Sequence, residues 1–400
     1  MDFDKIRDQF PALEEKVFLD AACASLAPRA AAVAIQEFLD VALKCPSRSS
    51  TLHHIAMDDM RAAARAEIAR LINADEDEIA LLENTTQGLT VAAEALPLEP
   101  GDRVLISDLE FMQVALPWCQ KQKETGLEID VVPHRGGRVS IEDIAERIGG
   151  RTRVLAISSV QWSNGFRSDL GALGALCRDR RVWMVVDAIQ QLGAIPIDVK
   201  QTPVDMLACG GHKWLNAPFG VGFLYIRRGL TPELRKGVAG YLSLETPEGG
   251  WGNYFQTPTI APVRDYRFVE GARRYETGGT SNYPGAVGLA ASVKLINELG
   301  VSRIRDRIYD LTDYLIAGLQ TMGVDVVTPV ERDNRSGIVT FSVGEVKENL
   351  ALMERLLDRR VLVSVRYTSH IGGVRVSCHF YNSFEDLDRL LDIVEGWKKA

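Results

Sequence analysis

The sequence predicts an α/β protein in which a large domain, built on a mainly parallel sheet with helices on both faces, precedes a smaller α+β domain. Three observations predict this architecture. Short apolar runs alternate with helix-like segments through the first two thirds of the chain. After about residue 228 this alternation stops, and an aliphatic helix-like segment introduces a mixed order of helices and short strands. The length of 400 residues is enough for one large domain and a smaller one.

The apolar runs of the first two thirds are the expected strands of the large domain. These runs are Glu78–Leu82, Arg103–Ser107, Glu128–Val132, Val154–Ser158, Trp183–Asp187, Met206–Gly210 and Gly222–Arg227. Between them, apolar residues recur at roughly helical spacing. The expected helices include Gln87–Leu96, Val114–Thr125, Ile141–Ile148 and Leu170–Arg178.

The last third predicts a loop, a linking helix and a compact domain. Turn formers and large rings in Gly249–Pro258 indicate an ordered loop. The small and aliphatic residues of Ala286–Leu299 predict a helix that ends at Gly300. The elements expected after it are Arg303–Leu319, Gly337–Val343, Lys347–Arg359, Val361–Val365, Gly373–Cys378 and Asp386–Trp397. We therefore expect an N-terminal segment (1–20) that packs with the small domain, a large domain (21–285), and a linker helix with the small domain (286–400).

Composition excludes several functions. The net charge of −8 is spread along the chain without a basic stripe, so nucleic acid is not an expected partner. The sequence shows neither a secretory signal nor an apolar run near the roughly 20 residues of a membrane helix, and we expect a soluble, cytoplasmic enzyme. Six cysteines lie far apart, which favours reduced thiols. No metal site is expected, since adjacent His53 and His54 would point about 100° apart on a helix.

Lys213 is the first candidate for chemistry. It follows an apolar strand and two glycines, in Met206-Leu-Ala-Cys-Gly-Gly-His-Lys213, and would lie at the carboxyl edge of the sheet, where ligands bind. Partial desolvation there lowers the pKa of a lysine, so that more of it is present as the neutral amine. The neutral amine is the form that attacks an aldehyde to give a Schiff base. A surface lysine in a hairpin is the alternative.

Two further strand ends carry polar residues. A nearly wholly apolar strand ends at Asp187, whose buried carboxylate needs a cationic partner such as the protonated pyridine nitrogen of pyridoxal 5′-phosphate (PLP). A helix N-cap is the alternative for Asp187. Thr85 and Thr86 stand where a strand turns into a helix, an arrangement that binds anions, although Asn84 or Thr85 could simply cap that helix. The order of anion site, carboxylate and lysine predicts a PLP enzyme.

With these residues, the chain resembles the class V aminotransferase family of fold-type I PLP-dependent enzymes. The resemblance runs from Val17-Phe-Leu-Asp20-Ala-Ala to Phe380-Tyr-Asn-Ser-Phe-Glu-Asp-Leu-Asp and covers nearly the whole chain. The family includes cysteine desulfurases, selenocysteine lyases, kynureninases and isopenicillin N epimerases. The resemblance implies a fold-type I large domain with a seven-stranded sheet, PLP as cofactor, an amino-acid substrate, and a homodimer with shared active sites.

The resemblance also implies roles for individual residues. Those that it places around the cofactor are Thr85, Thr86, Phe111, Asn164, Asp187, Gln190, His212, Lys213 and Thr280. Asp187 would hold the pyridine nitrogen, and Lys213 would carry the Schiff base. Thr280 would reach the cofactor of the partner subunit, with Thr277 as the alternative because Glu276-Thr-Gly-Gly-Thr280 is one residue longer than the common pattern.

The remaining implied contacts concern the phosphate, the pyridine hydroxyl and the substrate. Thr85, Thr86 and His212 would bind the phosphate, and Asn164 and Gln190 would face the hydroxyl.

The substrate α-carboxylate would be clamped by Arg366, because a guanidinium pairs bidentately with a planar carboxylate. Arg375 is a second candidate for this clamp, and a surface salt bridge is the alternative for either arginine. Asn164 is also expected at the substrate.

Three positions depart from the desulfurase pattern. Phe111 stands where desulfurases stack a histidine on the cofactor. A phenylalanine here resembles kynureninases and epimerase-like members, although a core phenylalanine is the alternative. Gly210 replaces a serine that often contributes a phosphate hydroxyl. No cysteine lies in Arg366–Arg375, where desulfurases carry their nucleophile, which disfavours a protein-bound persulfide; Cys378 lies past this segment in an expected strand.

The expected reaction proceeds through an external aldimine and a Cα carbanion formed with Lys213 as the base. We expect a C–S or β-lyase or an isopenicillin N epimerase-like enzyme. An aminotransferase and a kynureninase-like hydrolase are the enzymatic alternatives, and a non-catalytic PLP-binding protein is the alternative of another class.

Overall fold

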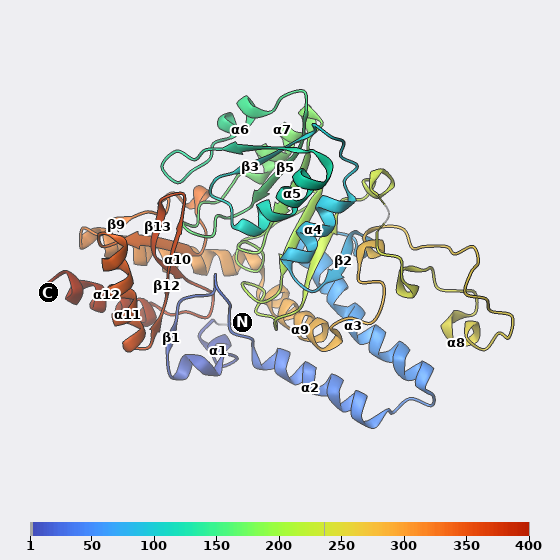
Figure 1. Cartoon of the computed structure of the whole chain (residues 1–400). Coiled ribbons are helices and arrows are strands. Elements are labelled where there is room, and N and C mark those ends of the chain that lie inside the picture. Colours follow the sequence, from blue (N-terminus) through green and yellow to red (C-terminus); the bar gives the residue numbers. More distant parts are fainter. Residues whose placement is uncertain (1–2, 236, 400) are drawn as a thin grey trace.

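The computed structural model describes residues 3–235 and 237–399. A seven-stranded sheet forms the centre of the large domain, with helices on both faces (Figure 1). Its strand order is β2-β8-β7-β6-β5-β3-β4, and β8 is antiparallel to both neighbours while the other pairs are parallel. The strands are β2 (Ile79–Leu82), β3 (Arg103–Ser107), β4 (Glu128–Val132), β5 (Thr152–Ser158), β6 (Trp183–Asp187), β7 (Met206–Gly210) and β8 (Gly222–Ile226).

Alternate residues of the central strands contribute to two hydrophobic cores, one on each face of the sheet. Along β6, Met184 and Val186 belong to one cluster and Val185 to the other. Helices α4 (Thr85–Ala95) and α5 (Met112–Thr125) contribute to the core that contains Val185. The opposite core is covered by α3 (Ser50–Ile72), α6 (Ile141–Arg147), α7 (Leu170–Arg180) and α9 (Tyr283–Leu299). Burial on both faces explains why these strands are apolar without alternation.

The small domain contains an antiparallel sheet of order β12-β13-β10-β9. Its strands are β9 (Asp325–Val326), β10 (Ile338–Ser342), β12 (Ser364–Thr368) and β13 (Ile371–Ser377), and its helices are α10 (Val301–Thr321), α11 (Val346–Asp358) and α12 (Phe384–Lys398). The N-terminal segment, with α1 (Phe3–Arg7), places β1 (Val17–Phe18) parallel to β11 (Val361–Leu362). We therefore propose that this segment belongs with the small domain.

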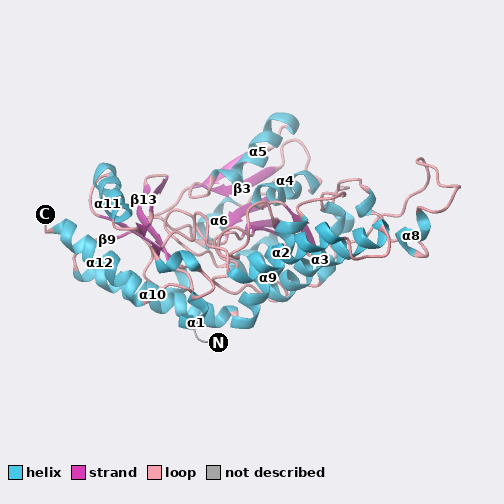
Figure 2. Ribbon diagram, turned by 90° about the horizontal axis from the view of Figure 1, so that it is seen from below, coloured by secondary structure: helices cyan, strands magenta, loops and turns pink. Residues whose placement is uncertain are grey.

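Two regions extend beyond the sheets. Helix α9 packs against α3 and against α2 (Arg29–Lys44), and the three lie side by side in Figure 2. The segment with α8 (Gly250–Tyr254) projects away from the body of the molecule, at the end opposite the small domain (Figures 1 and 2). Short 3₁₀ helices are Pro11–Glu14, Glu76–Glu78, Thr231–Glu233, Tyr241–Ser243, Ala272–Tyr275 and Arg332–Asn334. Among the described residues, no helix combines the length and apolarity that a bilayer crossing needs.

The predicted strands of the large domain are confirmed, with small shifts at their ends. The expected strand Val361–Val365 is instead divided, because Val361–Leu362 pairs with the N-terminal segment while Ser364–Thr368 pairs with β13. Helix α3 was not among the expected elements. Its buried face includes Arg61 and Arg65, which interrupt the apolar periodicity that predicts a helix.

Candidate functional site

A cavity of about 360 Å³ lies at the carboxyl edge of the parallel strands. Asp187 ends β6 and Ser158 ends β5, and both line it. Arg366 and Arg375 reach it from the small domain, and Cys23 reaches it from the turn just after Asp20. The full lining is Ala22, Cys23, Asn84, Thr85, Thr86, Phe111, Gln113, Ser158, Val160, Trp162, Asp187, Ile189, Gln190, His212, Lys213, Arg366 and Arg375. Segments far apart in the sequence therefore meet at one site.

Lys213 and Asp187 form the ionisable centre of the cavity. Burial lowers the pKa of Lys213 to about 8; nearby Asp187 opposes this shift, and Arg375 adds to it. Burial raises the pKa of Asp187 to about 6, opposed by the N–H of Ile189 and by Lys213. The Ile189 N–H donates to Asp187 Oδ1 at 2.9 Å, which leaves Oδ2 for a cationic partner. The lysine can thus supply a neutral amine near neutral pH.

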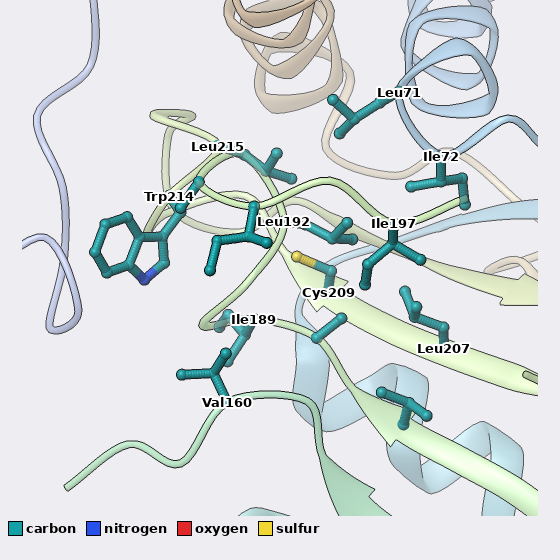
Figure 3. Packing of buried hydrophobic residues seen from close by; sticks show 14 of the residues in the cluster. Leu71, Ile72, Val160, Ile189, Leu192, Ile197, Leu207, Cys209, Trp214 and Leu215 are labelled. Carbon is teal, nitrogen blue, oxygen red and sulfur yellow. The ribbon is translucent and has the colours of Figure 1, made fainter. Parts of the chain in front are cut away.

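The backbone around Lys213 is held in place by Trp214. The indole Nε1 donates to Gln190 Oε1 at 2.8 Å, and the Trp214 carbonyl oxygen lies 3.1 Å from His379 Nε2. Figure 3 shows Trp214 packed in the same cluster as Leu215 and Leu192. The close-packed tryptophan fixes where the chain at Lys213 enters the cavity.

The start of α4 lines one end of the cavity. Asn84 caps the helix by accepting from the Gln87 N–H at 2.8 Å, and the N–H groups of the first turn have no acceptor within the helix. The Thr85 hydroxyl accepts from the Gly210 N–H at 2.8 Å, while Thr86 is exposed. A Cβ at Gly210 would lie only 3.1 Å from Thr85 Oγ1, so glycine leaves room that a serine would fill.

His212 lies on the same side of the cavity. Burial, together with the charge of Lys213, lowers the pKa of His212 to about 4. The ring stacks on Phe219, with centroids 5.0 Å apart. His212 is therefore a neutral hydrogen-bonding group at physiological pH.

Two rings form an aromatic wall. Phe111 and Trp162 both line the cavity and make an edge contact, with centroids 5.2 Å apart. Phe111 is 39% exposed, so it is not a core side chain. Its exposed ring is free to pack against a planar ligand.

Glu110, directly before Phe111, anchors the loop after β5. Its carboxylate accepts from the Ser158 N–H at 3.0 Å, from Gln161 Nε2 at 2.8 Å and from the Ser158 hydroxyl. Burial raises the pKa of Glu110 to about 7, opposed by these hydrogen bonds. Glu110 thus ties the segment with the aromatic wall to the end of β5.

The two candidate arginines differ in environment. Arg375 is 2% exposed, pairs with Asp20 at 2.9 Å, and donates Nη1 to the Trp162 carbonyl at 2.9 Å. Arg366 is half-buried and directs Nη1 to the Val365 carbonyl and Nη2 to Cys23 Sγ at 3.8 Å. Both guanidinium groups line the cavity.

Two predicted site residues do not reach the cavity. Asn164 is fully buried, donates to the Gly137 carbonyl at 2.7 Å and accepts from the Phe166 N–H at 3.0 Å. Its amide stabilises a turn, and Trp162 lines the cavity in its place. Thr280 is exposed, and Thr277 has a buried hydroxyl without a partner among the described residues; neither lines the cavity.

Sequence reasoning did not single out Cys23, Ser158, Trp162 or Glu110. Ser158 and Trp162 stand at or just after the end of β5, the same signal that identified Asp187 on β6. Cys23 follows the Asp20-Ala-Ala motif by one residue, but no local pattern indicates that this turn reaches the cavity.

Comparisons with known proteins cover nearly the whole chain. The model of the family described as Aminotransferase class-V matches residues 17–390. A probable cysteine desulfurase of Pyrococcus abyssi is 27% identical, over 99% of this chain and 98% of its own length. Isopenicillin N epimerase of Streptomyces clavuligerus is 30% identical, over 83% of each chain. The apo structure of a cysteine desulfurase from Thermococcus onnurineus is similar with a TM-score of 0.86 and 25% identity, covering 99% of this chain and 98% of that one.

Proposed function

The chain belongs to the aminotransferase class-V family of PLP-dependent enzymes, and from this premise we propose that it cleaves a β-substituent, foremost a C–S bond, from an α-amino acid. The observation that carries the proposal is the convergence of Lys213, Asp187 and Arg375 in one cavity. The Pyrococcus relative is named a probable cysteine desulfurase and the Thermococcus structure a cysteine desulfurase, and these names support a substrate that contains sulfur.

The residues of the cavity fit PLP. The free N–H groups at the start of α4, with Thr85 and neutral His212, suit a phosphate, and Phe111 offers a ring to stack on. Asp187 suits a protonated ring nitrogen. When bound, PLP supplies an aldehyde that condenses with amines and a ring that withdraws electrons from the substrate Cα.

The protein's own groups then bind the substrate and move a proton. Arg375 is suited to the α-carboxylate, because its buried guanidinium side chain lines the cavity together with Lys213. The Lys213 amine, with a pKa of about 8, can remove the Cα proton at neutral pH and later return one. Phe111 and Trp162 form an apolar wall on one side of the cavity.

Gln190 is suited to hold this arrangement in place. Its amide bridges the Trp214 indole and the Ala22 carbonyl, at 2.8 and 3.1 Å, which ties the Lys213 turn to the turn just after Asp20.

A two-part experiment tests the proposal. Borohydride reduction of the holoenzyme should attach the cofactor to the peptide that contains Lys213, and the buried Lys121, outside the cavity, should stay unmodified. The holoenzyme is then incubated with L-cysteine, L-cystine, other amino acids and D-enantiomers, while pyruvate, sulfide, keto acids and stereochemistry are followed. Pyruvate with released sulfur is expected, and Lys213→Ala should abolish it. An unlabelled Lys213 peptide would refute the cofactor site, and an inert panel would refute the lyase.

A second candidate function is amino transfer. Arg366 adds a second guanidinium to the cavity, which would suit a dicarboxylic amino acid such as glutamate. If glutamate converts the bound cofactor to its pyridoxamine form, and a keto acid then removes the amino group from that form, amino transfer is favoured. Arg366→Gln should slow the reaction with glutamate more than the reaction with alanine. Epimerisation would appear instead as loss of optical activity without release of the side chain.

We further propose a homodimer in the cytoplasm. The unpartnered Thr277 hydroxyl and the projecting α8 segment support contact with a second copy. Light scattering of the holoenzyme should give twice the mass of the 44.1 kDa chain, and a monomer that binds PLP and turns over would contradict it.

A further inference from the structure

The backbone of the turn that carries Lys213 is bound by both domains. The Lys213 carbonyl accepts from the Asn216 N–H at 2.9 Å, within the same turn of the large domain. The next carbonyl, that of Trp214, has its partner in the small domain, because His379 Nε2 lies 3.1 Å from it. His379 stands just beyond the end of β13. A residue of the small domain therefore holds the peptide that follows Lys213.

The indole of Trp214 is inserted into the small domain. A Cβ added at Gly337, the residue before β10, would lie 2.6 Å from the indole Cη2 and 2.8 Å from Cζ3, so a larger residue there would displace the ring. The ring centroids of His379 and Trp214 are 5.2 Å apart. The Cys378 N–H donates to the Gly337 carbonyl at 2.9 Å, which joins the two sides of this slot. Trp214 is fully buried, so its position follows that of the small domain.

His379 has one defined hydrogen-bonding state. Its Nδ1 accepts from the Phe380 N–H at 2.8 Å, so the single ring proton is on Nε2 and is donated to the Trp214 carbonyl. Burial lowers the pKa of His379 to about 3, and the hydrogen bond to Trp214 opposes this shift. The ring also stacks on Tyr381, with centroids 4.9 Å apart. At neutral pH His379 is therefore an uncharged donor of fixed orientation.

The strand that leads to His379 also carries Arg375. The side chain of Arg375 lines the cavity together with Lys213. Strand β13 is paired with β10, which directly follows Gly337. The guanidinium and the slot around the Trp214 indole thus belong to one paired unit, and a shift of that unit would move both together.

We propose, resting on the role of Lys213 as the base in the function proposed above, that His379 is a positioning residue: through Trp214 it ties the Lys213 turn to the strand that carries Arg375. The amine that removes the Cα proton and the guanidinium suited to the α-carboxylate then keep one separation. Because the carboxylate of an amino acid is attached directly to Cα, this separation sets where the Cα proton lies relative to the amine. A displacement of about 1 Å in such an arrangement is enough to slow a reaction about 100-fold.

The first test isolates proton removal. Holoenzyme is incubated with L-alanine in D₂O, and proton NMR follows deuterium at Cα; L-alanine has no β-leaving group, so the exchange reports proton transfer alone. His379→Phe keeps a ring beside Trp214 but removes the donor. We expect its maximal exchange rate to fall about 100-fold while the half-saturating alanine concentration changes less than about threefold, because Arg375 stays in place. His379→Gln returns an N–H donor and should recover about tenfold of this loss.

Leu390→Ala is the matched control for loss of stability. Leu390 is fully buried in α12 of the small domain, but in a different hydrophobic cluster from Trp214. Its truncation weakens the domain without touching the Lys213 turn, and urea titrations compare the stability of all variants. The exchange rate of Leu390→Ala should match that of the parent. An equal loss of exchange in Leu390→Ala and His379→Phe would overturn the proposal, since general destabilisation would then explain both.

A second readout needs neither cofactor nor substrate. Burial is the main cause that lowers the pKa of Lys213 to about 8, so a turn released from the small domain should admit water to the amine. Competitive labelling of cofactor-free protein over a series of pH values should therefore give a Lys213 midpoint that rises toward 10.5 in His379→Phe and stays unchanged in Leu390→Ala.

The two readouts separate this proposal from the proposed function. If His379→Phe has the exchange rate and the Lys213 midpoint of the parent, His379 does not position Lys213, although the proposed function stands. If Lys213→Ala exchanges the Cα proton as fast as the parent, or if no amino acid is turned over, the proposed function fails. The labelling midpoint then decides by itself whether His379 holds Lys213 in place.

Discussion

The amine of Lys213 should titrate near pH 8 in the cofactor-free protein. Burial lowers its pKa from 10.5 to about 8, a shift worth about 3 kcal/mol against the charged form. At pH 8 about half of the Lys213 amines are then neutral, compared with less than about 1% for a lysine of ordinary pKa. This difference is what would allow the residue to attack an aldehyde at neutral pH.

Competitive labelling measures this titration. A limiting amount of a small amine reagent is added to cofactor-free protein between about pH 6 and pH 11, and peptide mass spectrometry gives the labelled fraction at each lysine. The midpoint of the curve is compared rather than the absolute rate, because burial slows access of the reagent without moving the midpoint. Exposed lysines in the same digest are the reference.

Two substitutions should move the midpoint in opposite directions. Asp187→Asn removes a carboxylate that raises the pKa of Lys213, so the midpoint should fall further. Arg375→Gln removes a cation that lowers it, so the midpoint should rise. A Lys213 midpoint near 10.5, or the same direction of change in both variants, would refute the electrostatic account of the site.

Three further predictions concern stability. The raised pKa of Glu110, about 7, means that its protonated form contributes stability that is complete below pH 4.5 and lost as pH rises through 7. Relative to the parent, the free energy of unfolding of Glu110→Gln in urea titrations should therefore rise by up to about 3 kcal/mol between pH 5 and pH 8. The same difference between variant and parent at both pH values would contradict this. Gly193→Ala should lower the melting temperature strongly, because φ is 95° and the new Cβ would lie 2.1 Å from the Trp214 carbonyl oxygen. The control is Gly229→Ala, where φ is 88° but the new Cβ would enter open space, and its melting temperature should fall less. Glu276→Ala should lower the free energy of unfolding in denaturant by about 3–5 kcal/mol, because it leaves the two buried arginines of α3 without their carboxylate. A loss under about 1 kcal/mol would show that these two ion pairs add little to stability.

The parts of the site that sequence predicts well share a local cause. Lys213 and Asp187 each follow an apolar strand, and the ends of parallel strands meet at one edge of the sheet, so neither position needs knowledge of the rest of the fold. Asn164 also lies beyond a strand, but the turn directs its amide to the Gly137 carbonyl rather than to the cavity. Side-chain direction in a turn depends on backbone dihedrals that residue type alone does not specify.

The sequence by itself determined the doubly covered sheet and the place of Lys213, because burial on both faces leaves continuous apolar runs and the residues that follow them must lie at the sheet edge. Only the tertiary structure decided that Arg375 and Cys23 line the same cavity as this lysine. They lie on β13 and on the turn just after Asp20. They meet because the Asp20–Arg375 pair joins this turn to the small domain, while the Gln190–Ala22 hydrogen bond joins it to the carboxyl edge of the large sheet. Such contacts across most of the chain depend on how the domains pack, which leaves no periodic signal in the sequence.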